Sequence, residues 1–124
     1  MSIPVLKQGS ILVASLQAAA TNQDLVQLKD ELAAKVGRFR SQGVVIDLSV
    51  MDVMDSFATR TLRGIAQTIK LRGAETVIVG IQPEVAFAMV QLGLTLDGCA
   101  TALDLEEGMA LVATRASEDA GRGT

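Results

Sequence analysis

Three carboxylates and one hydroxyl lie close together near the middle of the chain. Asp47, Asp52 and Asp55 precede Ser56, which follows the last of them directly. Such a group could hold a metal ion for phosphoryl transfer to an aspartate, or it could offer the serine hydroxyl to another enzyme. It could also do no more than cap the start of a helix. The rest of the sequence decides among these roles.

A metal-assisted phospho-aspartate site of the receiver-domain type would need acids and a lysine that this chain lacks. It requires paired acids after an early strand, an acceptor aspartate after a middle strand and a lysine after a late strand. Asp47 could be the acceptor, but no acid pair follows Ile11–Leu16 and no lysine follows Thr76–Ile81. We therefore expect no metal site and interpret the acids as solvated loop residues, with Asp55 near a helix cap.

Groups for other kinds of catalysis are also missing. The chain has no histidine, so its one cysteine, Cys99, has no imidazole to activate it. No glycine-rich phosphate-binding loop follows a strand, and the G-x-G sequence at Gly121 and Gly123 lies near the C-terminus. We expect no catalytic residues, no cofactor and no enzymatic activity, and we interpret Cys99 as a small buried apolar residue.

Composition limits the partners. The chain has 124 residues, enough for one domain, and 49% of them are hydrophobic while 2% are aromatic, which predicts an aliphatic core. A net charge of −3 argues against a nucleic-acid partner. No apolar run approaches the roughly 20 residues that cross a bilayer, and Met1–Ser10 does not resemble a secretion signal. We expect a soluble cytoplasmic protein that does not bind membranes.

Hydrophobic periodicity predicts an α/β fold with a mixed, mostly parallel β-sheet and about four α-helices. The strands are expected at Ile3–Lys7, Ile11–Leu16, Val44–Leu48, Thr76–Ile81 and Ala100–Leu103, with the first two forming an edge hairpin. The helices are expected at Asn22–Val36 with Gly37 as a left-handed C-cap, from Ser56 to Gly73, from Pro83 to Gly93, and along Leu105–Ala116. We expect one domain over residues 1–116 and a disordered tail over 117–124.

The strand, turn and helix of Val44–Thr61 are expected to carry the functional site, because ligands collect at the carboxyl ends of parallel strands. Two questions stay open there on the residues alone. Ser56 either presents its hydroxyl to a partner enzyme or is itself the N-cap of the helix. Met51 and Met54 either form part of a partner surface or tuck under the core.

Three segments, VVIDLSVMDVMDSFATRTL, GIQPEVAFAMVQLGL and ATALDLEEG, resemble STAS domains of the anti-sigma-factor antagonist class. Within that class they resemble most the small, single-domain RsbS-type antagonists of the bacterial stressosome, over Ile3 to about Val112. The resemblance implies a STAS-like sheet and phosphorylation of Ser56 by a serine/threonine switch kinase, reversed by a phosphatase. It also implies assembly with larger STAS-domain sensor proteins of the RsbR type, in a scaffold that sequesters the kinase.

Thr59 and Thr61 are secondary candidates for phosphorylation, because they lie close to Ser56. The partner-binding residues are expected to be Asp52, Met54, Asp55, Phe57 and Arg60. Several other functions remain open at this point: a STAS module that binds a small ligand or nucleotide, an antagonist that binds an anti-sigma kinase directly, and a purely structural assembly subunit. Self-association into a homo-oligomer is also plausible, because aliphatic strand edges can pair.

Overall fold

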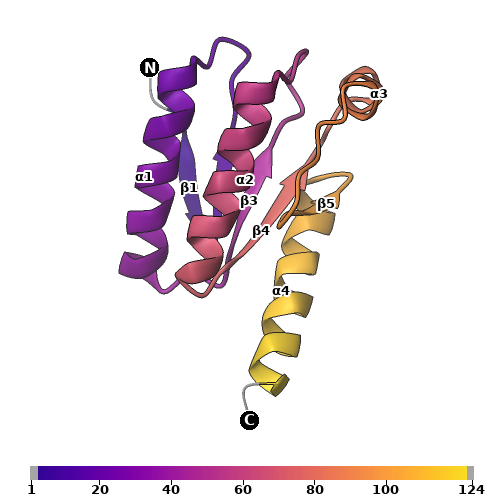
Figure 1. The fold of residues 1–124 in the computed structure, drawn as a ribbon. Coiled ribbons are helices and arrows are strands. Elements are labelled where there is room, and N and C mark those ends of the chain that lie inside the picture. The colour runs from indigo at the N-terminus through magenta and orange to yellow at the C-terminus, as the bar shows by residue number, and fades with distance from the viewer. Residues whose placement is uncertain (1–2, 123–124) are drawn as a thin grey trace.

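The structure is a computed structural model that describes residues 3–122, with side chains for residues 3–118. Strands and helices alternate along the chain (Figure 1). Their order is β1 (Val5–Gln8), β2 (Ile11–Ser15), α1 (Asn22–Phe39), β3 (Gly43–Asp47), α2 (Ser56–Leu71), β4 (Glu75–Val79), α3 (Pro83–Gln91), β5 (Ala100–Ala102) and α4 (Leu105–Arg122). This arrangement confirms the predicted α/β class with four helices.

The five strands form one sheet in the order β1-β2-β3-β4-β5. β1 pairs with β2 in the antiparallel direction, and the other neighbours are parallel. Val45 in β3 faces Val13 in β2 and Val77 in β4 across the ladder. The predicted edge hairpin and the predicted parallel sheet are both confirmed, and β3 lies at the centre as its continuous apolar sequence indicates.

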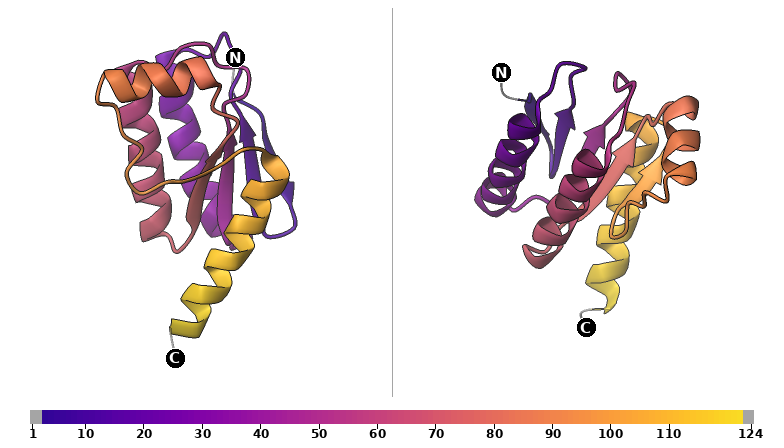
Figure 2. Two further views of the ribbon diagram at one scale, coloured as in Figure 1. Left: turned by 90° about the vertical axis from the view of Figure 1, so that its right-hand side faces the viewer. Right: turned by 45° about the horizontal axis from the view of Figure 1, so that its top comes forward.

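Helices cover both faces of the sheet (Figure 2). α1 and α2 pack side by side on one face and α4 packs on the other. Gly108 lets α4 approach the sheet closely, because a Cβ atom there would lie 2.5 Å from Cγ1 of Val79. The largest fully buried side chains are aliphatic: Leu12, Leu16, Leu28, Leu32, Ile46, Leu48, Leu62, Ile65, Ile69, Ile78, Val36 and Val44.

A capping box starts α1. The backbone N–H of Asp24 donates to Oγ1 of Thr21 (3.1 Å), and the N–H of Thr21 donates to Oδ2 of Asp24 (2.9 Å). This backbone donor is the main cause that lowers the pKa of Asp24 from 3.8. The stabilisation by the ionised carboxylate is therefore present at neutral pH and is lost as the pH falls through the lowered pKa of the folded state.

The C-terminal end of α1 corrects the prediction that Gly37 is its C-cap. The helix continues to Phe39, and Arg40 takes the left-handed conformation, with φ of 51°. The backbone N–H groups of Arg40 and Ser41 both donate to the carbonyl of Val36 and so close the helix end. Gly37 stays helical, and the side chain of Arg72 occupies the space that its Cβ would take.

The C-terminal helix is longer than expected. Its start is capped, because Oδ1 of Asp104 accepts the backbone N–H of Glu107 at 2.9 Å. α4 then runs to Arg122 and so includes most of the stretch that we expected to be disordered from Ser117. No proline interrupts the stretch, so the helix that begins at Leu105 can continue through it. The last two residues of the expected tail lie outside the described residues.

No helix in the described part of the chain is long and apolar enough to cross a membrane.

Candidate functional site

The loop between β3 and α2 is fixed by hydrogen bonds to the neighbouring strand end. Oδ1 of Asp47 accepts the backbone N–H of Ser49 (2.8 Å), and Nε2 of Gln82 donates to the carbonyl of Ser49 (2.8 Å). Gly80, with φ of 77°, allows this close approach, because a Cβ atom there would lie 3.0 Å from Oδ1 of Asp47. The start of α2 is therefore presented by a well-tethered loop.

Asp55 is the N-cap of α2, which settles one of the questions that the sequence leaves open. Its Oδ1 accepts the backbone N–H of Ala58 at 2.7 Å. Ser56 is consequently the first residue of the helix and not its cap. Its side chain is exposed and its hydroxyl makes no hydrogen bond with the residues that the structure describes.

The two threonines near Ser56 have different environments. Thr59 is 1% exposed, and its hydroxyl donates to the carbonyl of Asp55 at 2.9 Å. Thr61 is half-buried, and its hydroxyl donates to the carbonyl of Phe57 at 2.9 Å. Both hydroxyls are thus bonded to the helix backbone, whereas that of Ser56 is available.

Met54, one of the predicted partner-binding residues, is buried. Met54 is 4% exposed and belongs to the hydrophobic core, and Met51 is partly buried against the same core. A side chain buried in this way cannot contact a partner unless the loop opens. Met54 therefore tucks under the core, which is the other role that the sequence left open for it.

Two valines outside the predicted set of partner-binding residues lie at the surface of this loop. Val53 is 71% exposed and Val50 is 50% exposed, although both lie in the same loop as the methionines. Asp52 is exposed between them. The only signal in the sequence was four apolar residues in one short turn, more than a loop of that length can bury.

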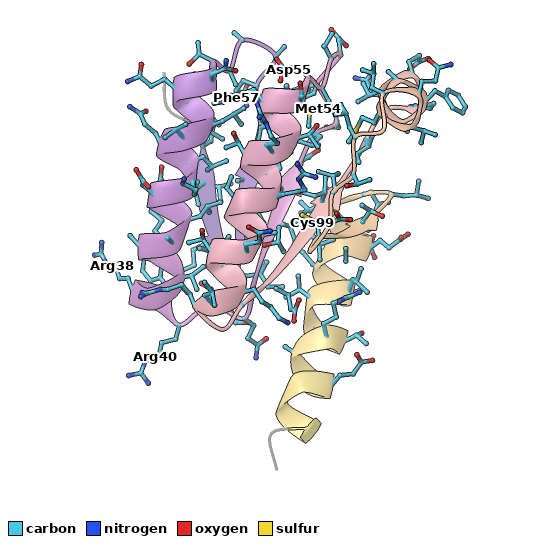
Figure 3. The ribbon with its side chains drawn as sticks, in the orientation of Figure 1. Arg38, Arg40, Met54, Asp55, Phe57 and Cys99 are labelled. Carbon is cyan, nitrogen blue, oxygen red and sulfur yellow. The ribbon has the colours of Figure 1, made fainter. Side chains whose placement is uncertain are left out.

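The other predicted residues line the start of α2. Phe57 is half-buried and Arg60 is exposed, and both border a shallow groove of about 310 Å³ between α1 and α2. Asp55 and Phe57 lie at the same end of α2 (Figure 3). The site therefore combines a free hydroxyl, exposed valines, carboxylates and a groove that could accept a partner's side chain.

Other chemistry finds little support in these residues. Within the described part of the chain, no three acidic or cysteine side chains are placed to hold a metal ion. Cys99 is partly buried, and burial, assisted by the charge of Asp97, raises its pKa to about 11. The thiol is protonated at neutral pH and is a poor nucleophile.

Comparison with known proteins agrees with this architecture. The family model described as the STAS domain matches residues 2–107. The chain belongs to the STAS domain family. A chain in a solved structure of a serine-to-glutamate variant of Moorella thermoacetica RsbS is 35% identical, with a TM-score of 0.78, and the match covers 93% of this STAS domain and 97% of that chain.

Two further matches of this STAS domain are to a chain from a structure of the stressosome and to an RsbT co-antagonist protein. A chain in a structure of the molecular architecture of the stressosome, a signal integration and transduction hub, is 36% identical with a TM-score of 0.76; the match covers 91% of this domain and 98% of that chain. RsbRA of Bacillus subtilis, an RsbT co-antagonist protein, is 29% identical over 107 residues, which are 86% of this domain. The match spans only 38% of the length of RsbRA.

The N-cap gives a direct test of the local geometry in this STAS domain. Asp55→Ala should lower the free energy of unfolding by about 0.5–2 kcal/mol, because the amide of Ala58 loses its acceptor. Asp55→Asn keeps a side-chain oxygen and should retain most of that stability. Urea denaturation of the two variants makes the comparison. Equal losses in both would show that the charge of Asp55, and not its capping bond, supports the helix.

Proposed function

We propose that this STAS domain is a non-catalytic regulatory subunit of a stressosome-type assembly in the cytoplasm. In this proposal a serine/threonine switch kinase is bound and sequestered at the Ser56 end of α2. The kinase then phosphorylates Ser56, which releases it, and a phosphatase restores the serine. The observation that carries the proposal is the exposed Ser56 hydroxyl, which the Asp55 cap leaves without a bond to the helix.

The geometry around the hydroxyl favours Ser56 over its neighbours as the acceptor. A kinase must place the hydroxyl in line with the γ-phosphate, so an exposed side chain at a helix start is accessible without unfolding. Thr59 would have to leave the core and break its bond to the carbonyl of Asp55. Thr61 would have to break its bond to the carbonyl of Phe57.

The local charges predict that a phosphate leaves the domain folded. A helix N-terminus favours an anion by about 0.3–1 kcal/mol at an exposed position. Asp52 and Asp55 oppose it, each by on the order of 0.7 kcal/mol per unit charge at about 6 Å in water. Salt at physiological strength roughly halves each repulsion at this distance. The opposing contributions are then comparable, so the phosphate acts on the surface that a partner covers.

The partner surface is proposed to be Val50, Asp52, Val53, Phe57 and Arg60 around Ser56. Apolar side chains exposed on a tethered loop are typical of recognition sites, because burying them gains free energy at little cost in loop ordering. A dianion in the middle of that surface would lose its water on binding, and Arg60, four residues along α2, would offset only about 0.2–0.5 kcal/mol of the cost. Binding of the unmodified protein and release of the phosphorylated one follow from this arrangement.

The relatives support a role within an assembly. The likeness to a chain of the stressosome and to RsbRA leads us to propose co-assembly with RsbR-type STAS sensor proteins. RsbRA is by its name a co-antagonist of RsbT, so it acts together with another protein. We propose that the present chain fills that second role and that its kinase is of the RsbT type.

Mapping of the phosphate tests the proposal. The protein is incubated with the cognate kinase and ATP, and the modified residue is located by mass spectrometry. Phosphate is expected on Ser56, with no incorporation in Ser56→Ala and normal incorporation in Thr61→Ala. Phosphate on another residue of the wild-type protein, or undiminished incorporation in Ser56→Ala, would overturn the proposed acceptor.

A further inference from the structure

Four cations gather at the end of the molecule opposite Ser56, although the chain as a whole is acidic. Lys7 lies in β1, Arg38 in the last turn of α1, Arg40 is the C-cap of α1 and Arg72 is the C-cap of α2. Figure 3 shows Arg38 and Arg40 at the end of the molecule far from Asp55. We call these four residues the basic end.

Phe39 holds two of the cations of the basic end beside each other. Nζ of Lys7 lies 5.8 Å from the centre of its ring, and Cζ of Arg38 lies 5.3 Å from it. Both distances fall within the range of cation–π attraction. Lys7 and Arg38 are distant in sequence. They come together because β1 is antiparallel to β2, so the last residues of β1 lie beside the first residues of β2 at this end of the sheet.

Arg72 joins the same group from α2. Its guanidinium lies against Gly37 of α1, in the space that a Cβ atom would fill. Arg72 therefore lies at the same end of α1 as Phe39, although Gly37 and Phe39 face different sides of the helix. Arg40, in its left-handed conformation, completes the cluster at the surface.

No described carboxylate neutralises the basic end. Lys35 and Lys70 are paired with Glu31 and Glu75, at 2.8 Å and 2.6 Å, but none of the four cations of the basic end has an acidic partner among the described side chains. The C-terminus of a helix carries only about half a negative charge. Helix dipoles therefore explain part of this cluster and leave an excess of positive charge.

The complementary surface lies at the other end of the same molecule. Asp52, Asp55 and Glu84 are exposed there beside one exposed cation, Arg60, and we call the three carboxylates the acidic end. The bond from Gln82 to the carbonyl of Ser49 holds the start of α3 beside the loop that carries Asp52. α2 connects the two ends: Asp55 caps its start and Arg72 its finish, over 16 residues, or about 24 Å at 1.5 Å per residue.

We propose that copies of this chain associate head to tail, with the basic end of one copy against the acidic end of the next. Opposite charges at opposite ends of a rigid domain favour contact between unlike ends, and a parallel side-by-side pair would set like charges against each other. The contact joins two different surfaces, so it is heterologous and can continue into a ring or a short row. This inference does not depend on phosphorylation of Ser56.

Complementary charge reversals test the proposal. One variant reverses the basic end (Arg38→Glu with Arg40→Glu), and the other reverses the acidic end (Asp52→Lys with Glu84→Lys). Neither pair includes an N-cap or a buried residue. The matched control, Lys29→Glu with Arg63→Glu, changes the charge by the same amount as the first variant, and both residues lie in the middle of their helices, away from both ends. Sedimentation velocity measures association, and circular dichroism melting confirms that each variant is folded.

The wild-type protein and the control should associate at about 50 mM salt. Their dissociation constant for self-association should be at least tenfold higher at about 500 mM salt, because salt screens the contact. Each reversed variant alone should be monomeric. An equimolar mixture of the two should associate again, since each then meets an end of opposite charge. A wild-type protein that stays monomeric at low salt would overturn the proposal, and so would reversed variants that associate alone as the wild type does.

Should a double reversal fail to fold, Arg40→Gln and Asp52→Asn offer milder versions. Each removes one charge from one end, and each should weaken association several-fold without preventing it. Unchanged association in both would also contradict head-to-tail contact. The protein is used as the full chain throughout.

Discussion

Phosphorylation of Ser56 should weaken binding of the switch kinase by about a thousandfold, which corresponds to about 4 kcal/mol. The reason is desolvation. The surface proposed for the kinase contains Val50, Asp52 and Val53, so a bound kinase would enclose the phosphate largely with apolar and acidic groups. The one cation of that surface, Arg60, would offset only part of its charge. Burying a charge without a partner costs several kcal/mol. Isothermal titration of the kinase with unmodified and phosphorylated protein measures the effect.

Two variants separate this charge effect from other causes. Ser56→Asp carries about half the charge of a phosphate, so it should weaken kinase binding by a smaller factor. Its melting temperature should stay close to that of the wild type, because an acid suits the first turn of a helix. Gln67→Asp places the same charge on an exposed position of α2, about 16 Å further along the helix, and should bind normally. Equal weakening by both would indicate a general effect of net charge.

Met54 and Val53 should respond to substitution in opposite ways although they are adjacent. Met54→Ala removes a side chain that is 4% exposed and should lower the free energy of unfolding by about 2–5 kcal/mol. Val53→Ala removes one that is 71% exposed and should change it by less than about 0.5 kcal/mol. Urea denaturation, followed by circular dichroism, measures both values.

Kinase binding should show the reverse pattern. Val53→Ala removes apolar area that the partner would bury and should weaken the complex about tenfold, or roughly 1.4 kcal/mol. Met54→Ala, measured at a temperature where the domain remains folded, should bind nearly as the wild type. If Val53→Ala had no effect and Met54→Ala weakened binding, the loop would have to open when the kinase binds.

Periodic parts of the fold could be predicted from the sequence. Leu25, Leu28, Leu32 and Val36 recur at helical spacing and are all buried on one side of α1. The run Val44–Ile46 is continuous and apolar and forms the centre of the sheet, where both faces are covered. In these places local pattern and tertiary burial demand the same structure.

Single-residue choices at helix ends could not be predicted so well. Asp55 and Ser56 are both good N-caps, and which of them caps α2 depends on where the tethered loop turns. Gly37 and Arg40 compete similarly at the end of α1, where the packing of Arg72 against Gly37 accompanies a longer helix. Residue preference alone ranks glycine first at such a position.

The surface depends on contacts that the sequence does not display. Hydrophobicity does not distinguish Met54 from Val53, because either could fill a gap beneath the loop, and the longer, more flexible side chain reaches it. The basic end combines Lys7, Arg38 and Arg72 from three elements: the first two meet at the ring of Phe39, and Arg72 packs against Gly37. Long-range juxtaposition of this kind lies outside any local pattern.

The charge switch at Ser56 is tested most directly by one cycle of binding measurements on a single sample. The dissociation constant for the kinase is measured before phosphorylation, after phosphorylation of Ser56, and after removal of the phosphate by a phosphatase. We predict tight binding, a loss of about a thousandfold, and full recovery. The same dissociation constant in all three states would contradict the proposed role of Ser56.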